Sequence, residues 1–244
     1  MNTIRLRIKV SCSLLLLLIA LIVRFRDFGS LKFVHSWIGS LLSGRSPLSD
    51  EVPWITFKAR AWLESYLKPN MSAFEYGSGG STIFLSKRVN ELISVEHDKG
   101  WCSRVSDVLS KAGISNCKLS LIEPEKKISG EMPIYSCRSY TATPRECEQY
   151  VGKSFEGYVR SIEEYPDRYF DLVFVDGMAR LSCIFHALSK IRPGGYLLLD
   201  NSDLPEYKEA RSFLADYKRT DFFGIGPYLY EVPLWQTSVW EIKS

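Results

Sequence analysis

From residue 53 onward, the chain alternates short apolar runs with stretches in which apolar residues recur every three or four positions. The apolar runs predict seven strands: Ser72–Tyr76, Glu91–Val95, Lys118–Ile122, Phe170–Val175, Tyr196–Leu199, Phe222–Gly226 and Thr237–Ile242. The periodic stretches predict helices: Trp54–Leu67, Thr82–Arg88, Trp101–Ala112, Tyr150–Ile162, Leu181–Ile191 and Glu206–Asp216. Strands that are apolar throughout indicate a sheet with helices on both faces. The alternation therefore predicts an α/β fold with a doubly wound, mostly parallel sheet.

The N-terminal end departs from this alternation. Val10–Val23 is a run of 14 residues without charge, and basic residues flank it on both sides: Arg5, Arg7, Lys9, Arg24 and Arg26. As a helix the run spans roughly 21 Å, short of the ~30 Å hydrocarbon core, although the flanking side chains can reach toward the interface. We expect residues 1–30 to form a single-pass membrane anchor. The alternatives are a signal peptide, for which no A-x-A-like cleavage site follows, and an interfacial or packed helix.

Residues 31–52 become rich in Gly, Ser and Pro toward their end and predict a linker, which leaves one α/β domain over residues 53–244.

Charged residues are distributed unevenly between the N-terminal part of the chain and the rest. Residues 1–50 contain seven Lys or Arg against two Asp, so the remaining residues contain 24 basic and 26 acidic side chains. A slightly acidic domain lacks the broad basic face that phosphate backbones require, so nucleic acid is not an expected partner.

Composition and cysteine spacing indicate a folded globular protein without a zinc site. Hydrophobic residues make up 45% of the 244 residues and charged residues 24%, values typical of a folded globular protein. The six cysteines include no CxxC pair, and no histidine lies at ligand spacing, so no zinc site is predicted. Cys137 and Cys147 flank a polar loop and would pair in an oxidising compartment, whereas free thiols are expected in a reducing one.

A glycine-rich turn follows the first predicted strand and opens a helix. Its sequence runs from Phe74 to Thr82 as FEYGSGGST. Glycines at such a turn let the backbone approach a ligand closely, where a Cβ would clash. The candidate ligand-binding residues of this segment are Glu75, Gly77, Ser78, Gly79 and Ser81.

An acidic residue, Glu96, closes the second predicted strand and is followed by His97. A carboxylate at this position can accept hydrogen bonds from both hydroxyls of a ribose. Glu96 lies 17 residues after Gly79, close to the ~20 expected in nucleotide-binding α/β folds; a solvated strand end is the alternative. His97 either lines an adenine pocket or caps the following helix.

Two further polar groups follow buried strands. Asp176 ends the fourth predicted strand, and Asp200 and Asn201 end the fifth, which follows the turn Arg192-Pro-Gly-Gly. The carboxyl ends of strands form the crevice in which open α/β sheets bind ligands. We therefore expect these side chains, together with Arg180, to lie at one crevice.

Taken together, these motifs resemble those of class I S-adenosylmethionine (SAM)-dependent methyltransferases over residues 53–244. The acidic residue before the first glycine, the acid ending the second strand and the Pro-Gly-Gly turn carry the resemblance, and Ser81 replaces the third glycine of the family motif. The segments EYGSGGST, SVEHDKGW and FVDGMAR are similar to those of a bacterial-type group without an assigned substrate. The resemblance implies a Rossmann-like seven-stranded fold and SAM bound by these residues: Glu75, Gly77, Ser78, Gly79, Ser81, Glu96, His97 and Asp176.

Methyl transfer is an in-line displacement that needs an aligned acceptor and, in many cases, a base for the acceptor proton. Asp176, Asp200 and Asn201 are the candidate catalytic residues. The same three resemble the acid, acid and amide set that holds a divalent cation in catechol-type O-methyltransferases, a set that suits Mg²⁺. The residues after Asp176 depart from that pattern, and without a metal Asp176, His97 or Asp200 would act as the base.

The expected function is methyl transfer from SAM to an oxygen of a small-molecule or glycan- or lipid-linked acceptor near a membrane. Because SAM is made in the cytosol, we expect a cytosolic catalytic domain. The polar stretch 123–165 is either a substrate lid or a surface insertion. One alternative is an NAD(P)-dependent oxidoreductase, against which stand Thr82 at the last glycine position and the lack of a Tyr-x-x-x-Lys pair. The other is a non-catalytic, membrane-tethered nucleoside-binding module.

Overall fold

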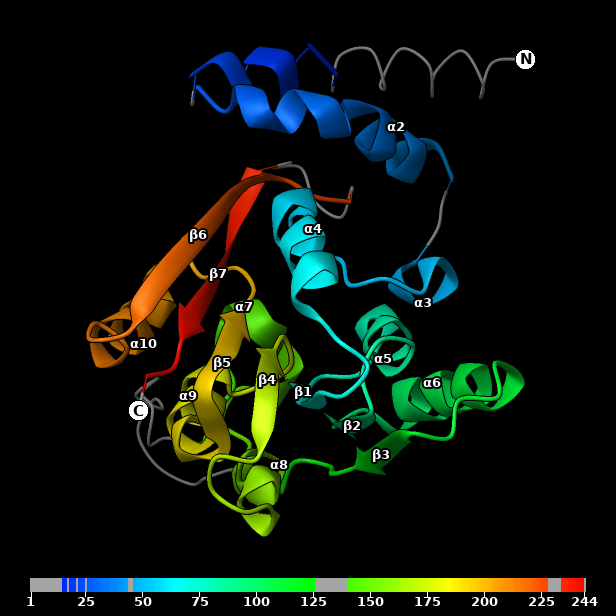
Figure 1. Ribbon diagram of the computed structural model, residues 1–244, viewed down its shortest axis with the longest axis vertical. Helices are drawn as coiled ribbons and strands as arrows, with labels where there is room; N and C mark the ends of the chain where they lie inside the picture. Colours follow the sequence, from blue (N-terminus) through cyan, green and yellow to red (C-terminus); the bar gives the residue numbers. More distant parts are fainter. Residues whose placement is uncertain are drawn as a thin grey trace.

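The computed structural model describes residues 15–16, 18–20, 22–24, 26–43, 46–125, 140–227 and 234–243. Their centre is one seven-stranded sheet in the order β3-β2-β1-β4-β5-β7-β6 (Figure 1). The strands are β1 (Ser72–Tyr76), β2 (Glu91–Glu96), β3 (Cys117–Leu121), β4 (Phe170–Val175), β5 (Ile191–Leu199), β6 (Lys218–Ile225) and β7 (Leu234–Glu241). The first five strands pair in parallel, and β7 is antiparallel to both of its neighbours.

Helices cover both faces of this sheet, as the apolar strands predict. Successive strand residues point to opposite faces, so Ala73 and Phe74 of β1 lie in different clusters of buried side chains. The cluster around Ala73 includes side chains of α4 (Phe57–Tyr66) and α5 (Gly80–Ser86), with α6 (Lys99–Lys111) packed beside α5. The cluster around Phe74 includes side chains of these helices: α8 (Glu156–Arg160), η3 (Ser161–Glu164), α9 (Arg180–Ala187) and α10 (Lys208–Phe213).

The element types agree with the sequence prediction, and the largest differences lie at boundaries. The helix predicted over Leu181–Ile191 ends at Ala187, followed by η4 (Leu188–Lys190), and β5 then begins at Ile191 and contains the Pro-Gly-Gly segment. The helix predicted over Tyr150–Ile162 is divided among η2 (Glu148–Tyr150), α8 and η3. The predicted turn residues lie between Ile191 and Tyr196, where the pairing of β5 with β4 shifts register, an irregularity that a hydrophobicity pattern does not reveal.

The expected linker contains helices. After η1 (Phe28–Phe33) come α2 (Val34–Ser43) and α3 (Pro47–Asp50). Figure 1 shows α2 across one end of the molecule, above α4 and β6. Trp37 of α2 is 1% exposed and belongs to a cluster of buried apolar residues, here named the N-terminal cluster: Leu18, Ile22, Trp37, Phe57, Ile225 and Leu234.

Two expectations fall partly outside the described residues. Positions 10–14, 17 and 21 of the apolar run Val10–Val23 are among those not described. Within the part of the chain that the structure describes, no helix combines the length and the hydropathy needed to cross a bilayer. Cys137 also lies outside the described residues, whereas Cys147 is a free thiol.

Candidate cofactor and active site

The glycine turn lies where β1 passes into α5. Gly77 has a φ of +93°, a conformation that side chains disfavour, and its Cα faces the backbone that follows β4. The turn then continues through Ser78 to Gly79, which precedes the first residue of α5. Because β1 and β4 are adjacent and parallel, this turn and Asp176 emerge at the same edge of the sheet.

Glu96, at the end of β2, is bound directly to this turn. Its Oε2 accepts hydrogen bonds from the Ser78 amide (2.9 Å) and the Ser78 hydroxyl (3.0 Å). Its Oε1 accepts from the amides of His97 (2.8 Å) and Asp98 (2.9 Å). Burial by itself raises the pKa of Glu96, but the hydrogen bonds from His97 and Asp98 outweigh it and lower the pKa below its usual value. A buried, ionised carboxylate therefore lies against the glycine turn.

A cavity of about 230 Å³ opens at the carboxyl ends of β1, β2 and β4. It is lined by Pro47, Pro53, Trp54, Gly77, Ser78, Gly79, Gly80, Ser81, Glu96, His97, Asp98, Trp101, Asp176, Gly177 and Met178. Seven of the eight predicted cofactor-binding residues are in this lining, with Glu75 the exception. Trp101 was not among the predicted site residues, and its indole Nε1 donates to the Ser78 carbonyl (2.6 Å).

Glu75 lies beneath the turn, is fully buried and does not line the cavity, so its contact with the cofactor stays a prediction. Its Oε2 accepts from the hydroxyls of Thr82 and Ser94, each at 2.6 Å. The Thr82 hydroxyl oxygen in turn accepts from the Gly79 amide (2.8 Å). Burial raises the pKa of Glu75 to about 7. Glu75 thus shapes the turn from below.

His97 lines the cavity, and Asp98 rather than His97 caps α6 by accepting from the Trp101 amide (2.6 Å). The His97 ring packs edge-on against Tyr150 (centroids 4.8 Å apart) and Phe155 (5.7 Å). Both aromatic residues come from the polar stretch 123–165. The described part of that stretch is therefore packed beside the cavity.

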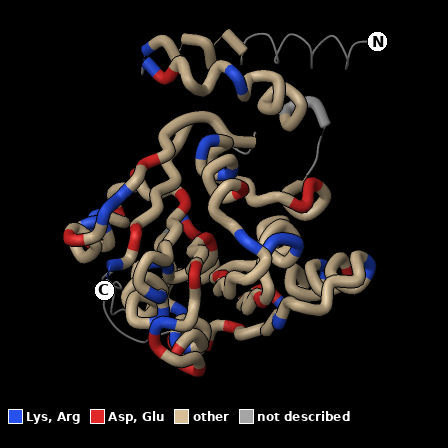
Figure 2. The backbone as a smooth tube through the Cα atoms, in the orientation of Figure 1, with Lys and Arg blue, Asp and Glu red and all other residues tan. Residues whose placement is uncertain are grey.

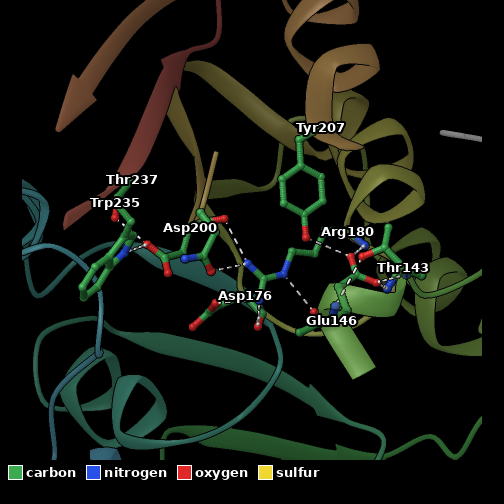
Figure 3. A network of polar contacts seen from close by, with 11 residues as sticks. Thr143, Glu146, Asp176, Arg180, Asp200, Tyr207, Trp235 and Thr237 are labelled. Atoms are coloured by element: carbon green, nitrogen blue, oxygen red, sulfur yellow. Dashed lines mark hydrogen bonds and ion pairs between the residues drawn. The ribbon is translucent and has the colours of Figure 1, made fainter. Parts of the chain in front are cut away.

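At the other side of the glycine turn, Arg180 connects the ends of β4 and β5 (Figure 3). Its guanidinium lies 3.1 Å from Asp176 Oδ1 and donates to the main-chain oxygens of Asp176 (2.9 Å), Gly177 (3.0 Å) and Asp200 (2.9 Å). It also donates to Asn201 Oδ1 (3.3 Å). Burial raises the pKa of Asp176, and the Arg180 charge opposes that effect. Arg180 thus fixes the strand ends and the Asp176 carboxylate together.

Asp200 and Asn201 do not line the cavity, contrary to their expected place beside the reacting groups. Asp200 is buried, and its Oδ1 accepts from Trp235 Nε1 (3.0 Å) and from the Thr237 hydroxyl (2.5 Å). Burial, with the Asp176 charge as the next cause, raises the pKa of Asp200 to about 7. The antiparallel strand β7 supplies both donors, and its position next to β5 is a long-range feature that local sequence patterns do not specify.

Glu146 is a half-buried polar residue that was not among the predicted site residues. It lies in α7 (Pro144–Cys147), and its carboxylate accepts from the amides of Thr143 (2.8 Å), Ala179 (3.0 Å) and Arg180 (3.1 Å). Tyr207 of η5 (Pro205–Tyr207) donates its hydroxyl to the same carboxylate (3.2 Å). The sequence signal was present, because Thr-Pro-Arg-Glu is a capping box. The Glu146 carboxylate also caps α9, and this second contact depends on the tertiary structure because α7 and α9 are distant in the sequence.

The divalent-cation set considered from the sequence does not fit the arrangement found. The Asp176 carboxylate and the Asn201 carbonyl oxygen both face the Arg180 guanidinium. The Asp200 carboxylate is held by donors from β7 instead. Among the described residues, no group of three or more His, Cys, Asp or Glu side chains is arranged to hold a metal ion.

No protein-family model and no curated protein matches the sequence. Solved structures do match the fold. An rRNA methylase from Streptococcus thermophilus is 12% identical, with a TM-score of 0.50 over 82% of this chain and 98% of that one. The O-methyltransferase TomG from Streptomyces achromogenes, solved in complex with SAM, is 16% identical, with a TM-score of 0.52 over 72% of this chain and 74% of that one.

A protein from Corynebacterium glutamicum gives a TM-score of 0.53 at 11% identity over 87% of this chain and 97% of that one. These similarities confirm the predicted class I methyltransferase fold. The strand order agrees with this result, because β7 runs antiparallel between β5 and β6. Classic dinucleotide-binding folds instead have the parallel order 3-2-1-4-5-6.

Proposed function

We propose that this chain is a SAM-dependent methyltransferase that acts on an oxygen of a small-molecule or glycan- or lipid-linked acceptor. One observation carries the proposal: the Glu96 carboxylate is bonded to Ser78 of the glycine turn, and Asp176 lies across the same cavity. The similarity in fold to methyltransferases, one of them solved with SAM, supports it. The residues present suit a nucleoside with a positively charged sulfur.

In this proposal, different residues of the cavity bind different parts of the cofactor. Glu96 is ionised and accepts the ribose hydroxyls, a role for which its two oxygens are suited. Gly77 and Gly79 give the methionine part access to the backbone. The rings of His97 and Trp101 line the cavity and supply apolar surface for the adenine. Asp176 lies at the opposite strand end, where a negative charge favours a sulfonium.

When bound, SAM supplies a methyl group on a positively charged sulfur. Asp176 is 31% exposed and lines the cavity, so it is the base best placed to accept the hydroxyl proton of the acceptor. The acceptor oxygen forms its bond to the methyl carbon, and the electrons of the broken carbon–sulfur bond go to sulfur. Asp200 and Asn201 are assigned supporting roles because neither lines the cavity.

The distribution of charge, rather than the fold, supports the proposed class of acceptor. The excess of basic residues lies in residues 1–50, and the rest of the chain is slightly acidic. Figure 2 shows Lys and Arg dispersed among Asp and Glu rather than gathered in one stripe. A dispersed pattern disfavours binding to phosphate backbones, so a small or glycan- or lipid-linked acceptor is proposed instead of nucleic acid.

The N-terminal segment is proposed to hold the chain at a membrane, with the catalytic domain in the cytosol where SAM is made. The charge-free sequence Val10–Val23 supports this proposal, as do the exposed apolar side chains Leu16, Val23 and Phe28. Fractionation of cells that express the full chain tests it. Recovery with membranes is expected, and recovery in the soluble fraction would refute it.

The proposed function is tested by calorimetric titration of the full chain with SAM, its demethylated product and NAD. Binding of the first two and none of NAD is expected. Glu96→Gln places an amide NH₂ group among N–H and O–H donors, and SAM affinity should fall by about ten- to a hundredfold, since an unpaired buried donor costs roughly 1–3 kcal/mol. Glu64→Gln, on the exposed side of α4, is the matched control. Unchanged SAM affinity in Glu96→Gln, or tight NAD binding, contradicts the proposal.

A further inference from the structure

The three residues that resemble a metal-binding set enclose a positive charge that the chain itself supplies. Arg180 has five N–H groups, and five oxygen atoms lie within 3.3 Å of its nitrogens. Two of these oxygens are Asp176 Oδ1 and Asn201 Oδ1, which belong to the acid, acid and amide set. The guanidinium therefore lies against two of the three side chains of this set and against the main-chain oxygen of the third residue, Asp200.

We propose that Arg180 takes the place of a divalent cation in this site and orients the Asp176 carboxylate toward the cavity, so that methyl transfer needs no metal. The inference rests on the proposed methyltransferase function. Arg180 does not line the cavity, so it is a positioning residue that acts through Asp176. Its planar fork suits this task, since it binds a carboxylate and neighbouring carbonyl oxygens in a fixed geometry.

The surroundings of Arg180 keep the side chain in this position. Glu146 binds the amides of Ala179 and Arg180 and so anchors the first residue of α9. The ring of Tyr207 lies beside the guanidinium, with its centroid 5.9 Å away. Arg180 is buried, and the charge is balanced by three carboxyl groups on other elements: Asp176, Asp200 and Glu146. Removing the guanidinium would leave these carboxyl groups without their common partner.

A divalent cation would have to displace several bonds to enter. Asp200 turns its Oδ1 toward Trp235 and Thr237 of β7 and away from the guanidinium (Figure 3). Its main-chain oxygen accepts a hydrogen bond from Arg180 (2.9 Å). A cation competing for Asp176 would therefore meet a fixed positive charge 3.1 Å from the carboxylate oxygen. Two positive charges sharing one carboxylate repel each other strongly in a partly buried site.

The test is a titration of the full chain with Mn²⁺, with SAM binding measured in parallel. Wild type is expected to bind no Mn²⁺ at this site, and its SAM affinity should not change when EDTA is added. Arg180→Ala removes the internal cation and should gain a Mn²⁺ site of roughly millimolar affinity, since the Asp176 carboxylate and the Asn201 amide oxygen then lose their positively charged partner. Arg180→Lys keeps the charge and should gain none. Asp176→Asn added to Arg180→Ala should abolish the gain.

Two results would overturn the inference. One is a wild-type chain that binds Mn²⁺ and loses it in Asp176→Asn. The other is an Arg180→Ala variant that is folded by circular dichroism and binds no Mn²⁺. The titration of the wild-type chain shows whether Mn²⁺ binds there even where Arg180→Ala fails to fold. Failure of the proposed function is distinguishable, because it would appear as a wild-type chain that does not bind SAM.

Discussion

The backbone of Gly77 touches the backbone of Gly177. A Cβ on Gly77 would lie 2.6 Å from the Gly177 Cα and 2.7 Å from its amide nitrogen. These two glycines follow β1 and β4, so their contact brings the glycine turn and Asp176 to the two sides of one cavity. Side chains at either position would push the strand ends apart.

We expect Gly77→Ala to destabilise the protein by roughly 3–5 kcal/mol, because a steric clash with backbone adds to the cost of a positive φ. Gly113→Ala is the matched control. Gly113 also has a positive φ (+66°), but nothing lies within 4 Å of its added Cβ. The control should lose only about 1 kcal/mol. Urea unfolding monitored by fluorescence measures both, and equal losses would show that the contact is dispensable.

Glu75 should make stability depend on pH. Its folded pKa of about 7 lies above the ordinary 4.5, so the unfolded carboxyl ionises first as the pH rises. Between these two values unfolding releases a proton, and stability therefore falls with rising pH by roughly 3 kcal/mol in total. Above pH 7 the contribution is constant.

Glu75→Gln cannot ionise and keeps an oxygen acceptor for the hydroxyls of Thr82 and Ser94. Its free energy of unfolding should decline less than that of wild type between pH 4.5 and 7. Glu64→Gln, at an exposed position, should retain the wild-type slope. Urea titrations at several pH values compare the three proteins, and parallel curves for Glu75→Gln and wild type would contradict the prediction.

Trp37 should make α2 a stabilising part of the domain. It is buried in the N-terminal cluster against Phe57 and Ile225, so Trp37→Ala is expected to cost about 3–5 kcal/mol. Phe28→Ala is the control, since Phe28 is 57% exposed and its loss should have little effect. Denaturant midpoints measure both. A Trp37→Ala variant with the wild-type midpoint would mean that α2 contributes nothing to the stability of the domain.

Glu146 should fasten α7 to α9. Glu146→Ala leaves the amides of Thr143, Ala179 and Arg180 without their acceptor, which should cost roughly 2–4 kcal/mol. Limited proteolysis after residue 140 should become faster than in wild type. Glu156→Ala removes a half-exposed ion pair with Arg160 and should change stability by at most about 0.5 kcal/mol. Equal protease resistance in the two variants would show that Glu146 does not hold this segment.

The chain order of strands and helices could be read from the sequence, and so could several members of the site. Glu96 is the last residue of β2, Asp176 follows β4, and parallel strands end at a common edge. Because this arrangement repeats from strand to strand, the hydrophobic periodicity and the position of each acid at a strand end were sufficient to predict it. The predicted convergence of Glu96 with the glycine turn is present at 2.9 Å.

Other features depended on contacts between distant segments. The sequence predicts that Glu75 meets the cofactor, whereas packing places it beneath the turn against Ser94. Gly80, one of the glycines of the turn, is also needed because α3 packs against it and a Cβ would strike the Pro47 carbonyl. Neither outcome can be inferred from the motif, because both depend on which neighbour fills the space.

The sequence by itself determined the alternation of elements, the glycine turn and the acids at two strand ends, because each depends on residues close together in the chain. The sequence predicted that Arg180 lies at one crevice with Asp176, Asp200 and Asn201, but tertiary structure alone decided which oxygen atoms its guanidinium binds. Tertiary structure also decided that Glu146 caps α9 from a segment more than 30 residues away. The reason is physical: a buried charge needs partners in three dimensions, and sequence spacing does not show which partners the fold will bring to it.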